Sequence, residues 1–371
     1  MTIDAVALHR SRPPGGPKPN LAWSAFKTLR DRPFSMAVWA IFLLALAMLV
    51  PALLQWAIFD ATWSAENRQG CDPDGACWAF VISRLPQFAF GFFPSQERWR
   101  AAVALLAPII ALGLALGPAF RWRTPIVVFV LATYPVFSTL ILHGELLGLT
   151  LVPTTQWGGM TMTVYVGTVA FVSAFPIGFL LALARMSRLP ALYVLATVFI
   201  EVWRGLPLIA VLFIAVVMVP LILPPGTEFP RLALALIGIS LYTSSYLAEV
   251  FRGGLQSIGK GQGEAAAALG FTFWNAQAYI LIPQAIRAVL PGILNTVVAL
   301  FKDTTYVLVV GLFDFLNIVT AAIADPQWLG LATEGYVFVG LVYWSFCFFL
   351  TRVGDSLERR LGEGQSRAAG V

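Results

Sequence analysis

Charged residues are scarce in this sequence. Asp, Glu, Lys and Arg make up 12% of the 371 residues, about half of the roughly 25% that is usual in soluble domains. So few charges cannot cover the surface of a soluble protein of this length. Hydrophobic residues reach 58% and the mean hydropathy is +0.79, which indicates a chain surrounded by lipid.

Histidine and cysteine are also rare. The chain has His9, His143, Cys71, Cys77 and Cys347, with no CxxC or HxxxH cluster, so we expect no metal site. Nucleophile motifs such as GxSxG are absent, and no clustered carboxylates share one membrane depth. We therefore expect no catalytic residue and no membrane-bound enzyme.

A basic face for nucleic acid is missing. The formal net charge is +5 and the pI is about 9.3, but the basic residues are scattered in short breaks between apolar stretches. This pattern is typical of membrane topology and excludes nucleic acid as an expected partner.

Long apolar stretches dominate the chain and predict an all-α integral membrane protein with about eight transmembrane helices. We expect the first stretch to be a retained helix and not a cleavable signal, because it is too long for one and follows a basic, Pro-rich tail at 1–35. The predicted spans are 36–58, 101–120, 125–143, 160–184, 206–223, 231–251, 290–312 and 335–351.

An even number of spans places both termini on one side of the membrane. If that side is the cytoplasm, most of the 24 Lys and Arg residues lie inside, as the positive-inside rule requires. We expect cytoplasmic tails at 1–35 and 361–371 and an outside loop at 60–100.

The outside loop carries two cysteines. Cys71 and Cys77 flank the turn-forming sequence DPDG in a compartment where disulfides persist. We expect a disulfide, the alternative being two partly buried free thiols, whereas Cys347 within the last span is a packing residue.

The stretch 185–206 has a break near its end. Apolar residues 191–200 are followed by Glu201, Arg204 and Pro207. We expect a membrane-surface helix that breaks before the proline and then enters the bilayer. Glu201 and Arg204 are three residues apart and are expected to form an ion pair on one helix face.

The hydrophilic segment 252–288 is long for a connection between two spans. Its EAAAAL sequence at 264–269 favours a helix that ends at Gly270, and 271–282 predicts a second helix that ends at Pro283. Two short helices with an alanine face suit a groove on another protein. The alternative is a helix pair that covers the bundle.

Six positions of this segment resemble the EAA signature of ABC importer permeases, although Ile282 stands where Leu is usual. The resemblance implies a type I permease core of five spans over 155–360, in which 252–288 is the loop that couples to an ATPase. The matching residues are Glu264, Ala265, Ala266, Gly270, Ile280 and Pro283.

Flanking motifs resemble the polar amino acid branch of that family, which includes histidine, glutamine, glutamate and general L-amino acid permeases. They are EVWRGLP from Glu201, YLAEVFRGG from Tyr246 and KDTT from Lys302, with Gly259 departing from the usual Pro. The additional 36–150 region, with three spans, resembles the extension of longer subunits that work beside a second permease. We therefore expect a heterodimer.

The family implies that energy comes from partners. Two cytoplasmic ATPase subunits would bind ATP and Mg²⁺, and a periplasmic binding protein would deliver substrate. This chain would hold no cofactor, since its GxxxxGK sequence ending at Lys260 is followed by Gly261 rather than Ser or Thr and no strand precedes it.

Polar residues inside spans indicate a candidate translocation path, because charge in the bilayer is costly. We expect Asp303 or Glu249 to bind the substrate ammonium and Lys302 its carboxylate; the alternative is that these side chains tie helices together. The full set is Thr243, Ser244, Ser245, Tyr246, Glu249, Asn295, Lys302 and Asp303.

Together these features predict a permease subunit, and not an enzyme, that carries polar L-amino acids across the bacterial inner membrane. The alternative is a secondary transporter driven by an ion gradient. That class works alone and typically has related halves with matched broken helices, and no convincing internal repeat is present in this chain.

Overall fold

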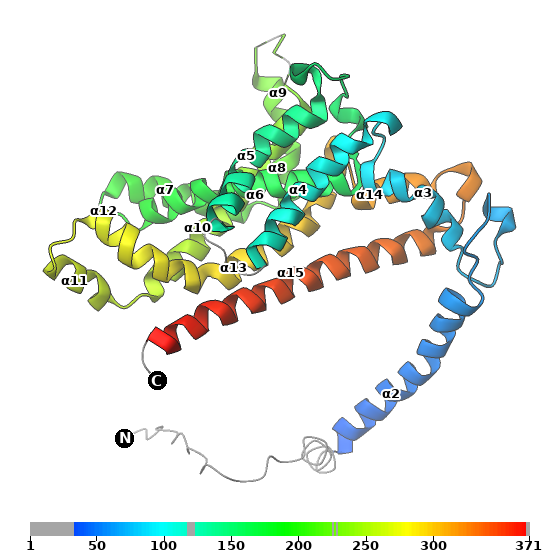
Figure 1. Ribbon diagram of the computed structural model, residues 1–371, viewed down its shortest axis with the longest axis horizontal. Coiled ribbons are helices and arrows are strands. Elements are labelled where there is room, and N and C mark those ends of the chain that lie inside the picture. Colours follow the sequence, from blue (N-terminus) through cyan, green and yellow to red (C-terminus); the bar gives the residue numbers. More distant parts are fainter. Residues whose placement is uncertain (1–32, 117–122, 225, 228, 369–371) are drawn as a thin grey trace. The chain divides into compact units, whose positions relative to one another are not determined.

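The protein is an all-α membrane protein in the computed structural model (Figure 1), which describes residues 33–116, 123–224, 226–227 and 229–368. The predicted N-terminal tail falls outside these residues except for 33–35. The helices are α2 (Pro33–Leu54), α3 (Trp78–Phe90), α4 (Arg98–Leu116), α5 (Arg123–His143), α6 (Gly159–Arg185), α7 (Pro190–Gly205), α8 (Leu208–Phe213), α9 (Val219–Ile222), α10 (Arg231–Ser257), α11 (Lys260–Ala268), α12 (Phe273–Ala276), α13 (Ile282–Asp303), α14 (Phe315–Ile323) and α15 (Ala332–Ala368).

Most predicted spans coincide with long apolar helices. Within the described residues, six helices are long and apolar enough to cross a membrane, or up to seven if one bent pair counts as a span. The predicted span 101–120 falls on α4, whose described part ends at Leu116. The last helix continues to Ala368, well past the predicted end of its span.

The bent pair lies where the sequence predicts a broken helix. Pro190–Gly205 and Leu208–Ile222 meet at 103°, and Leu206 and Pro207 between them are extended. Proline favours this break because it disfavours helical backbone in the residue before it and removes a backbone donor. The predicted break is confirmed, and the surface position of Pro190–Gly205 stays a prediction.

The chain divides into two compact units. In the smaller one, α2 runs into a π-helical turn, η1 (Gln55–Phe59). Its two chain segments are joined by backbone hydrogen bonds from Ala76 N to Trp56 O (2.9 Å) and from Thr62 N to Ala76 O (2.8 Å). Cys71 and Cys77 are disulfide-bonded, and Cys347 is a free cysteine.

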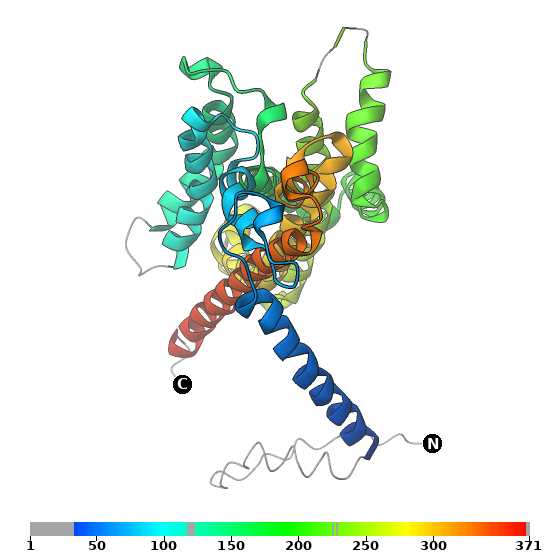
Figure 2. The same cartoon turned by 90° about the vertical axis from the view of Figure 1, so that its right-hand side faces the viewer.

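The larger unit is built around α6 and α10. A buried apolar cluster joins these helices to α4, α5, α8 and α13. Figure 2 shows the α4–α5 pair on one side of the unit and α8–α9 on the other. Near the start of α6, Gly158 and Gly159 form parallel bridges to the two-residue strand β1 (Phe313–Asp314).

The side chain of Asp314 links β1 to α14 and α15 through hydrogen bonds. Its carboxylate accepts from the backbone N–H of Asn317 at 3.1 Å and so caps α14, and it also accepts from the Tyr343 hydroxyl at 3.0 Å. Burial raises the pKa of the Asp314 carboxyl above its ordinary value because the charged form loses its hydration.

A glycine sets the distance between α6 and α10. A Cβ added at Gly178 would lie 2.8 Å from both Leu247 Cβ and the Ser244 carbonyl oxygen. Small residues let helix backbones approach closely in membranes, where dispersion contacts drive packing. Gly178 therefore allows the tight contact on which the larger unit depends.

We expect Gly178→Ala to lower the melting temperature of the purified protein, because overpacking costs about 1–3 kcal/mol. Gly113→Ala is the control, since Gly113 is also within a helix but has no atom within 4 Å of an added Cβ. The melting temperature of Gly113→Ala should match or exceed that of wild type. Equal melting temperatures for the two variants would show that Gly178 does not set this contact.

Candidate functional site

A cavity of about 430 Å³ opens between α10 and α13. Gly292 of α13 allows the two helices to lie close together here, because a Cβ added at this position would be 2.8 Å from Val250 Cγ1 of α10. Both polar and apolar side chains line its wall, so the cavity could hold a small polar molecule. It is lined by Tyr242, Thr243, Tyr246, Val250, Gly292, Asn295, Thr296, Ala299, Leu300 and Asp303, and we call it the α10–α13 cavity.

Four of the eight predicted path residues line this cavity: Thr243, Tyr246, Asn295 and Asp303. Tyr242, a polar residue of the same span as Thr243 and Tyr246, and Thr296 also line the cavity but were not in the predicted set. Helical spacing could have found them, because residues three or four positions apart on one helix share a face.

The other four predicted residues lie elsewhere. Ser244 and Ser245 are buried and donate to carbonyl oxygens of their own helix, at 2.7 and 2.6 Å. Lys302 is exposed and does not line the cavity, because adjacent helix positions point in different directions. Glu249 belongs to an ion-pair cluster instead.

Asp303 is the one charged side chain that lines the α10–α13 cavity, and among the described residues it has no ion-pair partner within 4 Å. On the wall formed by α10, the Tyr242 hydroxyl donates to the Tyr246 hydroxyl at 3.1 Å. An acidic group beside two aromatic rings attracts a cation, through its charge and through the electron-rich ring faces. The cavity therefore suits an ammonium group.

Glu249 is the centre of a cluster of charges from three helices. Its Oε1 accepts from Arg185 Nη1 of α6 at 2.7 Å, and its Oε2 accepts from Arg252 Nη2 of α10 at 2.8 Å. Arg204 Nη1 of α7 lies 3.9 Å from Oε2. Arg185 also donates to Glu201 at 2.7 Å, and we call these five residues the Glu249 cluster.

This cluster corrects two sequence predictions. Both carboxylate oxygens of Glu249 already accept from guanidinium groups, so Asp303 is the better candidate for the substrate ammonium. Glu201 pairs with Arg185 of α6 rather than with Arg204 of its own helix. The guanidinium of Arg204 instead lies 5.4 Å from the ring centroid of Tyr246, because the break after Gly205 brings α7 across α10.

The segment 252–288 forms two helices around a corner at Gly270. Hydrogen bonds from Gly270 N to Ala267 O and from Phe271 N to Ala266 O, each 3.0 Å, close the end of α11. Gly270 has a φ of +79°, which this type of helix ending requires and which glycine adopts without strain. The Thr272 hydroxyl caps α12 by accepting from Asn275 N.

The sequence predicted that the second helix ends at Pro283, but in the structure the helix continues past this residue. Chain 273–303 continues as α12, the π-helical turn η7 (Gln277–Leu281) and α13. The wider turn shifts the hydrogen-bond register and places Pro283 in the first turn of α13, where its missing N–H costs nothing.

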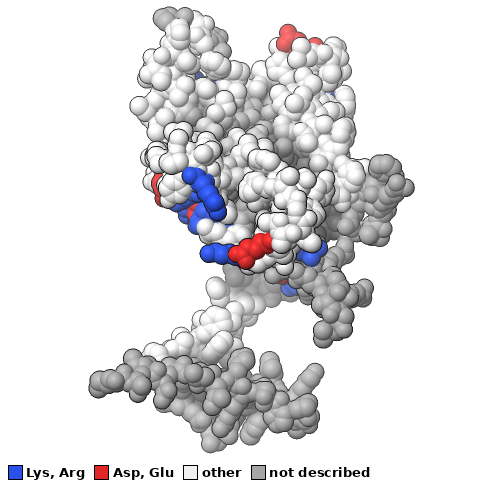
Figure 3. Space-filling view, turned by 90° about the vertical axis from the view of Figure 1, so that its left-hand side faces the viewer, with Lys and Arg blue, Asp and Glu red and all other residues white. Residues whose placement is uncertain are grey.

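Much of this segment faces outward. Glu264, Ala265 and Gly270 are exposed, Ala266 and Ala285 are buried, and Ile280 is half-buried. Figure 3 views the side on which α7, α11 and α12 lie and shows few charges on a largely uncharged surface, most of them across its middle and one acidic patch at the top. The exposed apolar side chains are Leu269, Phe271, Phe273, Trp274 and Tyr279, with Trp274 and Tyr279 at 69% and 74% exposure.

The GxxxxGK sequence lies across two helices. Gly254 is inside α10 and Lys260 begins α11, whereas a phosphate-binding loop follows a strand. Within the described ranges, no group of three or more His, Cys, Asp or Glu is placed to hold a metal ion.

Comparison with known proteins gives consistent matches. The family model described as a binding-protein-dependent transport system inner membrane component matches residues 174–363. The inner membrane amino-acid ABC transporter permease protein YhdY of Escherichia coli is 43% identical over 86% of this chain and 87% of its own length.

Two further proteins are similar to this chain. The glutamate/glutamine/aspartate/asparagine transport system permease protein BztC of Rhodobacter capsulatus is 33% identical, covering 93% of this chain and 95% of its own. A crystal structure of an amino acid ABC transporter with histidines is 28% identical, with a TM-score of 0.49, and covers 54% of this chain and 90% of that one.

Proposed function

The chain belongs to the family of binding-protein-dependent transport system inner membrane components, and from this premise we propose that it is the permease subunit of an ATP-driven importer of polar L-amino acids. The similarity to BztC, whose name specifies glutamate, glutamine, aspartate and asparagine, supports polar amino acids as the cargo.

The observation that carries this proposal is the exposed apolar surface of α11 and α12. Contiguous exposed aromatic groups on an otherwise compact helix pair are typical of a surface that another protein covers. Here the surface lies in the same segment as the six EAA positions, of which Glu264, Ala265 and Gly270 are exposed. In the proposed function it binds an ATPase subunit through 252–288, with the small side chains of α11 allowing a close approach.

The proposed complex has further components of three classes. Two ATPase subunits bind ATP and Mg²⁺ in the cytoplasm, a second, related permease pairs with this chain, and a periplasmic binding protein delivers substrate. Both termini of this chain lie in the cytoplasm of a bacterium. Closure of the ATPases would pull on 252–288 and change the packing of α10 and α13, which exposes the α10–α13 cavity to alternate sides.

Purification of the tagged chain from membranes, followed by reconstitution into vesicles, tests the proposal. We expect an ATPase and a second permease to copurify, and a labelled amino acid to enter the vesicles only when ATP and a binding protein are supplied. Uptake by the chain alone, driven by a proton or sodium gradient, would favour a secondary transporter instead.

We expect Asp303→Asn to lower amino acid uptake about tenfold or more, because the substitution removes the charge that faces the α10–α13 cavity. An ammonium that loses one charge-assisted contact loses roughly 1.5–3 kcal/mol. Uptake should be measured over a range of substrate concentrations in reconstituted vesicles.

Lys302→Met is the matched control, since it also removes one charge from the same turn of α13 but lies outside the cavity wall. It should retain most uptake. Equal uptake by Asp303→Asn and wild type would remove Asp303 from the substrate site.

A further inference from the structure

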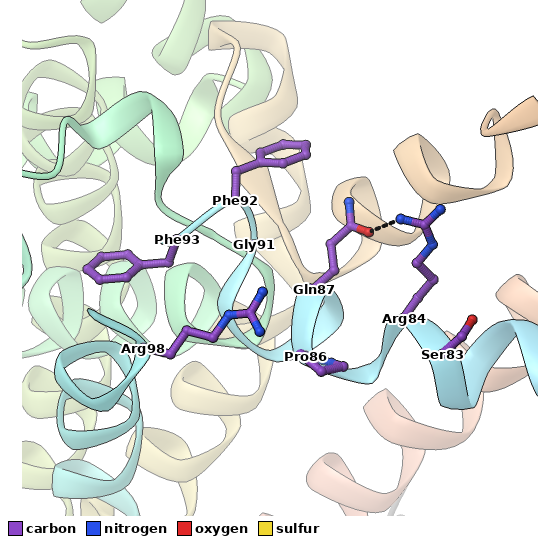
Figure 4. Close-up of a pocket in the computed structure, with 8 residues that line it drawn as sticks. All are labelled: Ser83, Arg84, Pro86, Gln87, Gly91, Phe92, Phe93 and Arg98. Atoms are coloured by element: carbon purple, nitrogen blue, oxygen red, sulfur yellow. Dashed lines mark hydrogen bonds between the residues drawn. The ribbon is translucent and has the colours of Figure 1, made fainter. Parts of the chain in front are cut away.

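A second cavity, which shares no lining residue with the α10–α13 cavity, lies between α3 and the start of α4. It measures about 480 Å³ and contains two arginines among its eight lining residues. Figure 4 shows Arg84 and Arg98 on opposite sides of the turn at Gly91, with Gln87 between them. The lining is Ser83, Arg84, Pro86, Gln87, Gly91, Phe92, Phe93 and Arg98, and we call it the α3 pocket.

The two arginines differ in their partners. Arg84 forms an ion pair with Asp325 and donates to Gln87 Oε1 at 3.3 Å. Arg98 has no ion-pair partner among the described residues. Its Nε is buried and makes no hydrogen bond there, and buried polar groups in folded proteins nearly always find a partner. The α3 pocket therefore carries one uncompensated positive charge.

Within the larger unit, α3 lies at the end opposite to α11 and α12 (Figure 1). Phe88, at the end of α3, packs against the first turn of α6, since a Cβ at Gly159 would lie 2.3 Å from the Phe88 carbonyl oxygen. Arg185, at the other end of α6, pairs with Glu249 near the segment 252–288. The 27 residues of α6 separate these ends by about 40 Å, which is the thickness of a bilayer.

The lining of the α3 pocket selects the kind of anion. No acidic side chain lines it, so the ammonium of a free amino acid would have no partner there. A lone carboxylate can pair with the Arg98 guanidinium in the planar geometry that arginine favours. At the rim, Phe92 is 46% exposed and offers an aromatic surface, and arginine with an aromatic neighbour is typical of protein interfaces.

We propose that the α3 pocket receives an acidic side chain of the substrate-binding protein when that protein docks on the outer face of the permease. This inference rests on the proposed function, because it requires a binding protein. The pocket precedes residue 174, where the family model begins, so this contact would belong to the extended subunits and help them select their own binding protein.

Uptake by reconstituted vesicles at increasing concentrations of the amino-acid-loaded binding protein tests this inference. The probe is the binding protein that stimulates the wild-type complex. We expect Arg98→Glu to raise its half-saturating concentration at least tenfold, with maximal uptake and copurified ATPase unchanged. Arg68→Glu changes the same charge within the same predicted outside loop but does not line the pocket, and should behave as wild type.

A charge exchange identifies the ligand. An acidic residue on the binding protein that is replaced by arginine should weaken docking to wild type and restore docking to Arg98→Glu. If Arg98→Glu has the wild-type half-saturating concentration while wild-type uptake depends on the binding protein, the docking inference is wrong and the proposed function stands. If no binding protein stimulates wild type, both fail.

Lipid is the competing ligand. The same titration is carried out in vesicles of phosphatidylcholine alone and of phosphatidylcholine with phosphatidylglycerol. An Arg98→Glu defect of equal size in both supports docking of a protein carboxylate. A defect that appears only with phosphatidylglycerol would assign the α3 pocket to a lipid phosphate and overturn the inference.

Discussion

Glu249→Gln is expected to abolish most amino acid uptake and to reduce the amount of intact complex in membranes. The substitution keeps the shape of the side chain but leaves Arg185, Arg204 and Arg252 without the carboxylate they share. The Glu249 side chain is 18% exposed, so the cost should lie between the roughly 1 kcal/mol of an exposed pair and the roughly 3–5 kcal/mol of a buried one.

Glu201→Gln provides the matched control, because it removes one carboxylate from the same Glu249 cluster. The Glu201 side chain is 56% exposed and forms its ion pair with Arg185, so its loss should cost less than about 1 kcal/mol. The measurements are the melting temperature of the purified complex and uptake by vesicles. If Glu201→Gln is as damaging as Glu249→Gln, the central position of Glu249 has no special role.

A double variant separates charge balance from specific contacts. Glu249→Gln combined with Arg252→Gln restores the net charge of the cluster. Partial recovery of the melting temperature relative to Glu249→Gln would give a coupling free energy between the two residues and would show that unpaired positive charge causes the defect.

Gly270→Val is expected to remove most of the copurifying ATPase while leaving the helices in the membrane intact. A β-branched residue cannot adopt the φ of +79° at Gly270 without strain of about 1–2 kcal/mol or more. This strain corresponds to about a 5–30-fold change in an equilibrium. Because an added Cβ at Gly270 has no atom within 4 Å, the effect would come from the backbone and not from a clash.

Gly263→Ala is the control in the same segment, and it is expected to stabilise α11 rather than to strain its backbone. Gly263 lies inside α11 with open space around it, and alanine favours a helix over glycine by about 0.5–1 kcal/mol. ATPase copurification should equal or exceed that of wild type. If Gly270→Val retains the wild-type amount of ATPase, the corner between α11 and α12 is not needed for docking.

The membrane spans could be predicted from the sequence because the conditions for crossing a membrane are met within each span itself. A helix that crosses lipid must satisfy its own backbone hydrogen bonds and present apolar side chains over about 20 residues, and the stretch 160–184 meets this condition without reference to any neighbour. The break before Pro207 and the corner at Gly270 are local in the same sense, since proline and glycine act through their own backbone.

Ion pairs and cavity walls could not be predicted in this way. Glu201 has Arg204 one turn away in sequence, yet it pairs with Arg185 of another helix because the 103° bend redirects α7. The predicted helix end at Pro283 was wrong because the π-helical turn before it absorbs the proline. Such a turn depends on how the helix packs along its length.

The sequence by itself therefore determined the membrane environment, the helical fold class, the EAA positions and the set of polar residues available for a path. Only the tertiary structure decided which of them meet: Asp303 lines the α10–α13 cavity, Glu249 is held by arginines from three helices, and Arg98 in the α3 pocket has no ion-pair partner in the part of the chain that the structure describes. The reason is physical. Hydropathy and turn preference act over a few residues, whereas a charge is paired or unpaired according to side chains that are distant in sequence.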